Sequence, residues 1–281
     1  MMTVSEFLTR GTAYAARRWH GVRRYLHVYD PEERRVLSFR GRYANGTCFV
    51  VGNGPSLSVQ DLENIRRAGG VCFASNKIYK IYPLTDWRPD YYACIDWRLF
   101  EQNRDELLDA VVCPSFFCRE FLASARAWAH DNHKSIEQTY YMTYGWRHSG
   151  KTVFYPQAAN ILSGGTVTFT LMELAWMMGF RNIVLIGCDH YYGSFAGETP
   201  HSAIIATDAL NRDYAVPDYV RPGEEVGVGD IEEMEYSYES ARRYAEKHGG
   251  EIINATRGGR LEIFKREDLD VVLGKIQNGT F

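Results

Sequence analysis

From residue 47 onward, short apolar runs alternate with longer runs of helical pattern. The apolar runs predict strands at 47–51, 71–75, 91–95, 110–113, 182–187 and 251–255. The runs of helical pattern predict helices at 58–68, 98–109, 118–129, 166–179 and 232–248. Strands that alternate with helices usually pair in parallel, and the helices cover both faces of the sheet. The alternation therefore predicts an α/β, Rossmann-like fold with a mostly parallel sheet.

Two long stretches, residues 130–162 and 193–231, fit neither pattern. They are rich in aromatic residues or in proline and glycine, and each is too long for a simple connection. In compact α/β domains, loops of this length often close over a binding site. We therefore expect long lid-like loops beside the sheet.

Residues 1–46 predict a basic helical extension, which leaves residues 47–281 as a Rossmann-like nucleotide-binding catalytic domain. The helix expected at 5–28 carries Glu6 against several arginines: Arg10, Arg17, Arg18, Arg23 and Arg24. Two interpretations stay open. The helix packs on the main domain with a solvated basic face, or it touches an anionic membrane surface or an acidic polymer.

Composition excludes several classes of protein. The 281 residues carry a formal net charge of −3, so the chain lacks the basic surplus of a duplex-binding protein, and no nucleic-acid partner is expected. The first residues do not resemble a signal peptide, and no window approaches the roughly 18 apolar residues of a spanning helix. The six cysteines form no Cys-x-x-Cys pair, and most lie in strand-like runs. This usage indicates reduced core cysteines and a cytoplasmic protein.

The strongest candidate phosphate site is a glycine loop between a predicted strand and a predicted helix: Gly52, Asn53, Gly54, Pro55 and Ser56. Glycines let backbone N–H groups approach an anion, and the following helix start adds a partial positive charge. Leu57 occupies the third glycine position of a dinucleotide motif, and no Gly-Lys-Ser/Thr of a P-loop follows. An ordinary tight strand-to-helix turn is the alternative.

Polar residues also follow the next two predicted strands. Asn76 can hydrogen-bond a ribose or a base edge, and Asp96 can face the same ligand, although each can instead cap the helix that follows. A second glycine loop opens the apolar helix expected at 166–179. It is a further candidate anion cradle, or a tightly packed helix start: Ser163, Gly164, Gly165 and Thr166.

The fifth predicted strand ends in Asp189, His190 and Tyr191. An Asp–His pair at a strand end can place a general base and the carboxylate that orients it, and Tyr191 can donate to a departing phosphate. Structural roles for Asp189 and His190 are the alternative. His201, in the long loop that follows, is either a second candidate base or a solvated side chain. Asp189 and His190 could in principle bind a metal, but no further ligand is spaced to complete the site, so no metal ligand is predicted.

The order and spacing of several motifs resemble a known bacterial family over about residues 47–265. The motifs are GNGPSL, ASN, PDYYACID, SGGTVTF, MGFRNIVLIGCDHYYG and EIINATRGGRLEIF. The family has a 6-hydroxymethylpterin diphosphokinase-like domain and is similar to the bacterial sialyltransferases that use CMP-sialic acid.

The resemblance implies a nucleotide site at these motifs. Residues 52–56 and Asn76 would hold the CMP moiety, Ser163 and Gly164 would lie near it, and Tyr191 would contact the leaving phosphate. The sialyltransferases work without a metal cofactor and sit on membranes through peripheral segments, which gives the basic helix a use at the inner face of the membrane. Family members often assemble, so a homo-oligomer is a further expectation.

Two positions depart from the sialyltransferase pattern. The general-base histidine of those enzymes lies shortly before the last long helix, whereas residues 227–232 contain no histidine. His190, His201 or a carboxylate must then substitute, or the reaction differs. Asp96 replaces an asparagine typical of the sialyltransferases, which places the chain nearer the diphosphokinase-like group.

The preferred hypothesis is a metal-independent, inverting glycosyltransferase that moves an acidic, sialic-acid-like sugar from a CMP-sugar donor to a surface-glycan acceptor. The first alternative is a pyrophosphokinase acting on a pterin-like alcohol, with Asp96 and Asp189 holding the Mg²⁺ that bridges the ATP phosphates. The second is a non-catalytic nucleotide-binding protein of a polysaccharide pathway, which the missing histidine favours.

Overall fold

The computed structural model describes residues 29–144, 152–156, 160–161, 163–191, 193–216 and 218–280. The helix predicted at 5–28 lies outside these residues. The described part forms a nine-stranded sheet in which each pair of neighbouring strands is parallel. This confirms the predicted α/β, Rossmann-like fold class.

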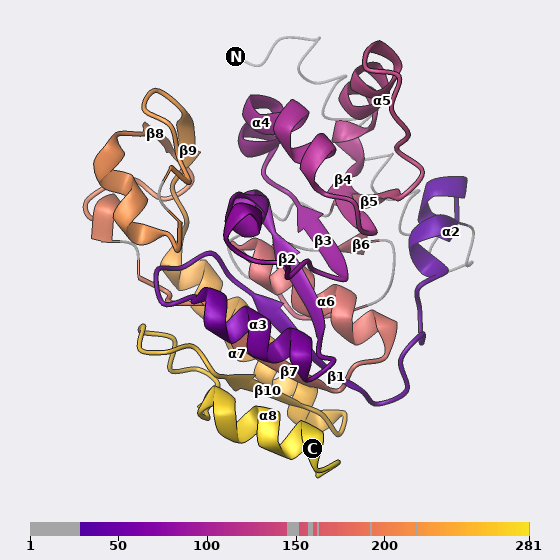
Figure 1. Cartoon of the computed structure of the whole chain (residues 1–281), viewed down its shortest axis with the longest axis vertical. Coiled ribbons are helices and arrows are strands. Elements are labelled where there is room, and N and C mark those ends of the chain that lie inside the picture. The colour runs from indigo at the N-terminus through magenta and orange to yellow at the C-terminus, as the bar shows by residue number, and fades with distance from the viewer. Residues whose placement is uncertain are drawn as a thin grey trace, which may run out of the picture.

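The strand order is β11-β10-β7-β1-β2-β3-β4-β5-β6 (Figure 1). The strands are β1 (Thr47–Val51), β2 (Val71–Ser75), β3 (Tyr91–Cys94), β4 (Ser115–Cys118), β5 (Thr139–Tyr144), β6 (Asn160–Ile161), β7 (Asn182–Ile186), β10 (Glu251–Asn254) and β11 (Lys265–Arg266). A separate antiparallel pair, β8 (Ala203–Ile205) and β9 (Glu225–Gly227), lies beyond one end of the sheet.

The helices are α2 (Pro31–Leu37), α3 (Val59–Arg67), α4 (Trp97–Ala110), α5 (Leu122–Asp131), α6 (Val167–Met178), α7 (Ile231–Lys247) and α8 (Leu269–Gln277). Short 3₁₀ helices are η1 (Asn76–Leu84), η2 (Arg119–Phe121), η3 (Gly193–Phe195) and η4 (Asp208–Asp213). The side chain of Asp268 caps α8 by accepting a hydrogen bond from the backbone N–H of Asp270.

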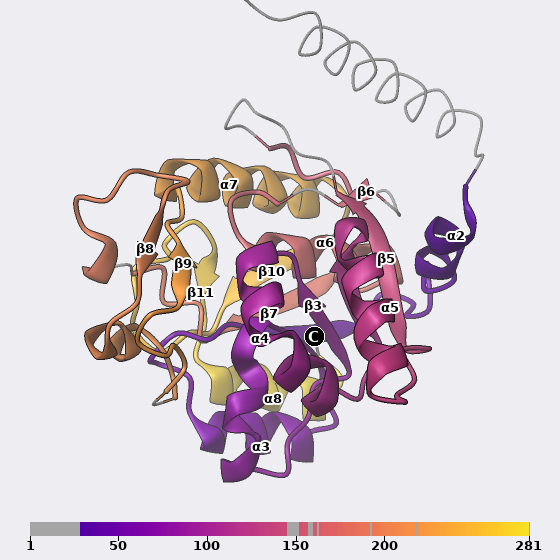
Figure 2. The ribbon, with the colours of Figure 1, turned by 90° about the horizontal axis from the view of Figure 1, so that it is seen from above.

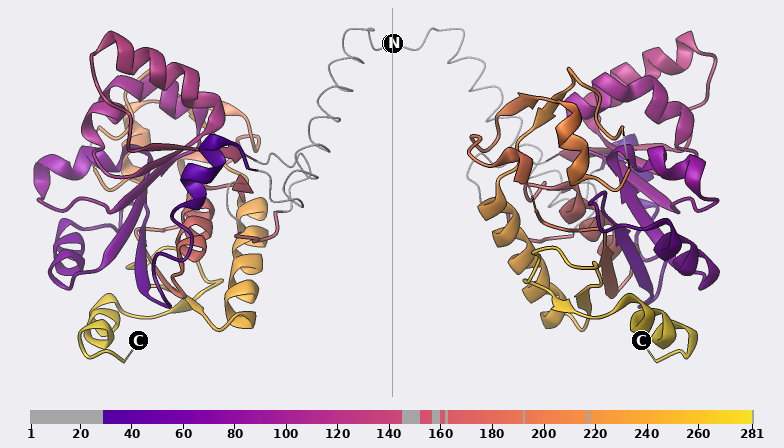
Figure 3. Two further views of the ribbon diagram at one scale, coloured as in Figure 1. Left: turned by 90° about the vertical axis from the view of Figure 1, so that its right-hand side faces the viewer. Right: turned by 60° about the vertical axis from the view of Figure 1, so that its left-hand side comes forward.

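Two apolar cores lie on opposite faces of the sheet. Along β1, Phe49 and Val51 enter the core that contains α3, α4, α5 and α8, whereas Cys48 and Val50 enter the core that contains α2, α6 and α7. The alternation follows from the period of two along a strand. Figures 2 and 3 show the two helix layers on either side of the sheet.

The segment before β1 packs on the second of these cores. Val36 and Phe39 are buried there, the ring of Tyr43 stacks on Phe180, and the backbone N–H of Tyr43 donates to the carbonyl of Met178 at 2.8 Å. Residues 30–43 are therefore part of the folded unit, whereas the role of residues 1–28 stays a prediction. No helix among the described residues is long and apolar enough to cross a bilayer.

One predicted strand is wrong. Residues 110–113 form the end of α4 and a bend, and the strand of this region is β4, which begins one residue after Pro114. Val112 is 73% exposed, whereas the aromatic pair Phe116 and Phe117 is fully buried. Burial of these rings outweighs the β-branched residues of the earlier run. Strands β5 and β6, helices α2 and α8, and the β8–β9 pair were not predicted.

The long stretch 193–231 folds as a small unit at the carboxyl ends of the strands. It contains η3, β8, η4 and β9 and leads into α7 (Figure 1). Its residues Ala206, Leu210, Tyr219 and Val220 are buried in the core that contains α3 and α4. The predicted lid-like loop is therefore an ordered cover with its own hairpin.

Candidate functional site

The sheet has a topological switch point between β1 and β7. The chain runs outward from β1 through β6 and then returns to β7 on the other side of β1. In open α/β sheets, ligands bind in the crevice outside the carboxyl ends of the strands at such a point. The loops that leave β1 and β7 here are the predicted glycine loop and the predicted Asp-His-Tyr segment.

These two loops pack directly against each other. The backbone N–H of Gly52 donates to the carbonyl of Ile186 at 2.8 Å, and that of Gly54 donates to the carbonyl of Gly187 at 2.9 Å. A Cβ on Gly52 would lie 2.3 Å from the Gly187 carbonyl oxygen, and one on Gly54 would lie 2.0 Å from an Asp189 carboxylate oxygen. The glycines are thus needed for loop-to-loop contact.

Gly52→Ala should therefore lower the free energy of unfolding by about 2–3 kcal/mol, because overpacking forces the backbone apart. The matched control is Gly274→Ala in α8, where a Cβ meets nothing within 4 Å. This control should be neutral or stabilising by about 0.5–1 kcal/mol, since alanine favours the helix. Urea unfolding of both variants measures the difference, and equal stability would contradict the packing argument.

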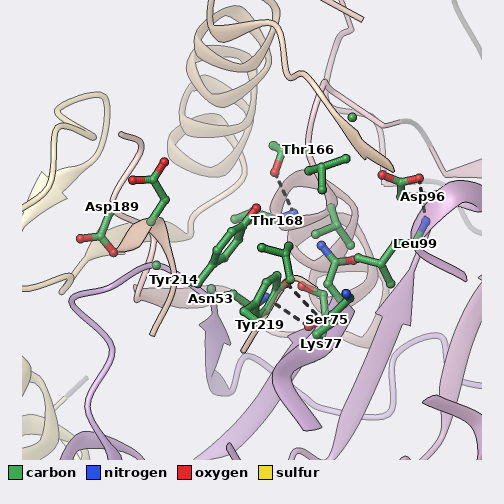
Figure 4. A pocket seen from close by; sticks show the side chains of 18 of the residues that line it. Asn53, Ser75, Lys77, Asp96, Leu99, Thr166, Thr168, Asp189, Tyr214 and Tyr219 are labelled. Carbon is green, nitrogen blue, oxygen red and sulfur yellow. Dashed lines mark hydrogen bonds between the residues drawn. The ribbon is translucent and has the colours of Figure 1, made fainter. Parts of the chain in front are cut away.

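Asp189 organises the glycine loop. Its carboxylate accepts hydrogen bonds from the hydroxyl of Ser56 at 2.7 Å and from the backbone N–H of Ser56 at 3.3 Å, and the residue is buried. Asp96 caps α4 by accepting from the backbone N–H groups of Arg98 and Leu99. The two carboxylates proposed to share Mg²⁺ lie on opposite sides of the cavity (Figure 4).

Asn53 and Asn76 line the floor of the cleft. The Asn53 side-chain amide donates to the backbone carbonyl of Ser75 at 3.2 Å, and the Asn53 backbone carbonyl accepts from the backbone N–H of Ala215 in the cover at 2.9 Å. Asn76 adopts a left-handed backbone conformation with φ 54°, which is uncommon for a residue other than glycine. Its buried Oδ1 has no hydrogen-bond partner among the described residues. Asn76 thus offers an acceptor to a ligand.

The second glycine loop leads directly into the start of α6 and contains two glycines in left-handed conformations. The hydroxyl of Thr166 accepts from the backbone N–H of Thr168 and caps α6. Gly164 and Gly165 have φ of 50° and 76°, and the Ser163 hydroxyl accepts from the Gly165 N–H at 3.4 Å. The loop ends beside Met234 of α7. It therefore borders the cleft from the α6 side.

Two adjoining cavities occupy the strand ends. The first, of about 220 Å³, is lined by most of the predicted residues: Gly52, Asn53, Gly54, Asn76, Asp96, Thr166, Asp189, His190 and Tyr191. The second, of about 500 Å³, is lined by Ser163, Gly165 and His201 and shares Asn76, Asp96 and Thr166 with the first. Pro55, Ser56 and Gly164 line neither cavity.

The two candidate histidines differ in environment. The His190 ring is 5% exposed, packs edge-on against Tyr238, and has its Nε2 3.4 Å from Glu235. Burial lowers the pKa of His190, and Glu235 opposes this effect. The His201 ring is 58% exposed at the second cavity. Both residues have left-handed backbone conformations, which are common at functional sites.

Tyr191 follows His190 at the mouth of the first cavity. Its ring is 45% exposed, and the guanidinium of Arg260 lies 4.3 Å from the ring centre. The backbone N–H of Arg260 donates to the carbonyl of Asp189, which fixes the loop after β10 to the loop after β7. Arg257 of the same loop instead forms a bidentate ion pair with Asp61 of α3.

The β8–β9 hairpin brings His201 to the start of the last long helix. The backbone N–H of His201 donates to the carbonyl of Val228, and that of Val228 donates to the carbonyl of Ser202, both at 2.9 Å. His201 Nε2 then lies 3.4 Å from Asp230, the N-cap of α7, and 3.5 Å from Glu233. A histidine therefore lies next to the start of α7 in space, although it belongs to the segment before β8 and not to the residues that directly precede the helix.

Comparison with known families places the chain. The model described as 6-hydroxymethylpterin diphosphokinase MptE-like matches residues 24–194, which is more than half of the sequence. The chain belongs to the MptE-like family. The matched region ends just after the Asp-His-Tyr segment, so the cover and α7 lie outside it. No match was found among curated proteins.

Two solved structures are similar to this MptE-like chain. One is the MAf glycosyltransferase from Magnetospirillum magneticum AMB-1, with 15% identity, a TM-score of 0.48, and coverage of 89% of this chain and 41% of that one. This MptE-like protein thus spans less than half of the length of that enzyme. The other is the sialyltransferase CstII from Campylobacter jejuni in complex with cytidine-5'-monophosphate, with 10% identity, a TM-score of 0.38, and coverage of 80% and 85%.

Several residues of the MptE-like site were not predicted. Lys77, immediately after Asn76, is 2% exposed, and its ammonium lies 2.5 Å from Glu224 of the cover. Tyr214 and Tyr219 stack with ring centres 3.9 Å apart and line the first cavity. The sequence signals for these residues are weak, because lysine and tyrosine in loops are usually solvent-facing.

Proposed function

We propose that this MptE-like protein is a metal-independent glycosyltransferase that moves an acidic, sialic-acid-like sugar from a CMP-linked donor to a glycan hydroxyl. The observation that carries the proposal is the position of His201. The sialyltransferase pattern needs a histidine before the last long helix, and His201 lies there beside Asp230 although it is distant in sequence. This position supports His201 as the general base that the sequence left unassigned.

The first cavity suits the nucleotide. It is walled by the glycine loop and by Asn76, whose Oδ1 is an acceptor ready for a ribose hydroxyl or a base amino group. Tyr191 stands at its mouth, where its hydroxyl would donate to the departing phosphate. Such a donor stabilises the charge that develops on a leaving group.

The second cavity suits the acceptor. It opens beside the first, and the exposed ring of Trp97 at its edge offers an apolar face to a sugar. In the proposed reaction, His201 Nε2 takes the proton of the acceptor hydroxyl as its oxygen attacks the anomeric carbon. The bond from that carbon to the phosphate oxygen breaks, and CMP leaves.

A thermal-shift panel with CMP, CDP, UDP, ADP and ATP, each with Mg²⁺ or with EDTA, tests the proposal. CMP should stabilise the fold by about 2.7 kcal/mol at a hundredfold excess over its Kd, with or without EDTA. Asn76→Ala should reduce this stabilisation because it removes the acceptor that CMP uses. Failure of CMP to stabilise the wild-type protein would contradict the proposal.

The family description favours a pyrophosphokinase as the second candidate. Its ATP phosphates would need Mg²⁺, yet the Asp189 carboxylate is engaged by Ser56 and Asp96 caps α4. Stabilisation by ATP only in the presence of Mg²⁺ would favour this candidate. Stabilisation by CMP without turnover of any CMP-sugar would instead favour a nucleotide-binding protein.

A further inference from the structure

Three side chains with metal-binding chemistry meet at the second cavity. His201 precedes β8, Asp230 follows β9, and Glu233 lies in the first turn of α7. The pairing of Ala203 with Gly227 across the hairpin fixes the first segment beside the second. One ligand atom from each of the three residues lies within 4.8 Å of the others.

The distances from His201 to the two carboxylates match those between ligands of one metal ion and are long for a hydrogen bond. His201 Nε2 lies 3.4 Å from Asp230 Oδ2 and 3.5 Å from Glu233 Oε2. A good N–H···O hydrogen bond would be about 2.7–3.2 Å long. Ligands at about 2.1 Å from a tetrahedral Zn²⁺ are separated by about 3.4 Å. The two His201 distances therefore fit ligands of one shared ion, and the two carboxylates lie within 4.8 Å of each other.

The charges of the cluster also favour a cation. Glu233 is 7% exposed, and its carboxylate accepts no hydrogen bond from the described residues. Neither Asp230 nor Glu233 forms an ion pair with a described lysine or arginine. A carboxylate drawn partly out of water is stabilised by a proton or a cation beside it.

We propose that His201, Asp230 and Glu233 form a binding site for Zn²⁺ or a similar first-row divalent cation. One imidazole nitrogen and two carboxylate oxygens suit such ions better than Mg²⁺, which prefers octahedral oxygen ligands and keeps several waters. Three protein ligands would leave a fourth position open, and all three residues line the second cavity.

The site has a consequence that rests on the proposed function. A metal bound to His201 Nε2 occupies the lone pair that would accept the proton of the acceptor hydroxyl. Zn²⁺ should therefore inhibit transfer reversibly, and EDTA should restore it. The glycosyltransferase remains metal-independent in this scheme, because the ion blocks the base.

Isothermal titration of the chelator-stripped full chain with Zn²⁺ tests the site directly. Glu233→Gln and His201→Ala should each weaken binding at least tenfold, since even outer-shell changes at metal sites cost that much. The matched controls are Glu232→Gln, the exposed neighbour on α7, and His130→Ala, whose exposed ring lies 3.0 Å from Asp131. Both controls should bind Zn²⁺ like the wild type.

Co²⁺ gives a second measurement, because its visible absorption reports coordination geometry. Wild-type protein should show the intense band of four-coordinate Co²⁺, and Glu233→Gln should lose it while keeping its circular dichroism spectrum. Wild-type affinity in both Glu233→Gln and His201→Ala would overturn the site. CMP stabilisation, measured separately without metal, tests the proposed function alone, so the two failures are distinguishable.

Discussion

Replacing His201 with alanine should reduce sugar transfer about 10²–10⁴-fold, the usual contribution of a positioned general base. The ring lies at the second cavity, more than half exposed, with Asp230 and Glu233 beside it. It makes few packing contacts that the fold would lose. CMP binding, measured by thermal shift, should therefore stay within twofold of the wild type, whereas the rate of transfer from a CMP-sugar in the presence of EDTA should fall.

His130→Ala is the control for this variant, because it also removes a histidine that lies beside an aspartate. His130 is exposed and does not line either cavity. The control should transfer at the wild-type rate. His190→Ala distinguishes the two candidate bases. The His190 ring is almost fully buried against Tyr238. Loss of this ring should therefore lower the free energy of unfolding while leaving the rate of transfer nearly unchanged. Near-normal transfer by His201→Ala with a large loss in His190→Ala would move the base to His190.

The parallel sheet could be predicted because its central strands are buried on both faces. Strands β1 and β2 have the predicted bounds, 47–51 and 71–75, since such strands read as unbroken apolar runs. Helix α6 was equally readable, because every residue from Phe169 to Met178 is buried. The edge of the sheet formed by β5 and β6 could not be predicted, because these strands lie in a stretch of sequence with no alternating pattern.

Only the part of the candidate site that lies in the loops after the strands could be predicted from the sequence. The loops after β1 and β7 meet because parallel strands present their carboxyl ends at one edge. The partners of His201 were not predictable, because they depend on the β8–β9 register within a cover that has no regular hydrophobic period. Asp230 is the N-cap of α7 and Glu233 lies in its first turn, where acidic residues are common without any ligand.

The pair of Lys77 and Glu224 should hold the cover on the sheet, and Lys77→Met should lower the free energy of unfolding by about 3–5 kcal/mol. The Lys77 side chain is 3% exposed and that of Glu224 is 11% exposed. Burial lowers the pKa of Lys77, although Glu224 acts in the opposite direction. Removal of the ammonium leaves a largely buried carboxylate without its cation. Urea unfolding measures the loss, and limited proteolysis within 193–231 should become faster.

The double variant Lys77→Met with Glu224→Met tests whether the cost arises from the unpaired charge. Replacement of a whole buried ion pair by apolar residues is often neutral, so this variant should recover most of the stability. The surface control is Lys134→Met, which breaks an exposed pair with Asp109 and should cost less than about 1 kcal/mol. A similar small loss in Lys77→Met would mean that the buried pair does not anchor the cover. A large loss that the double variant does not recover would assign the effect to lost packing of the lysine stem, including its contact with the ring of Tyr219.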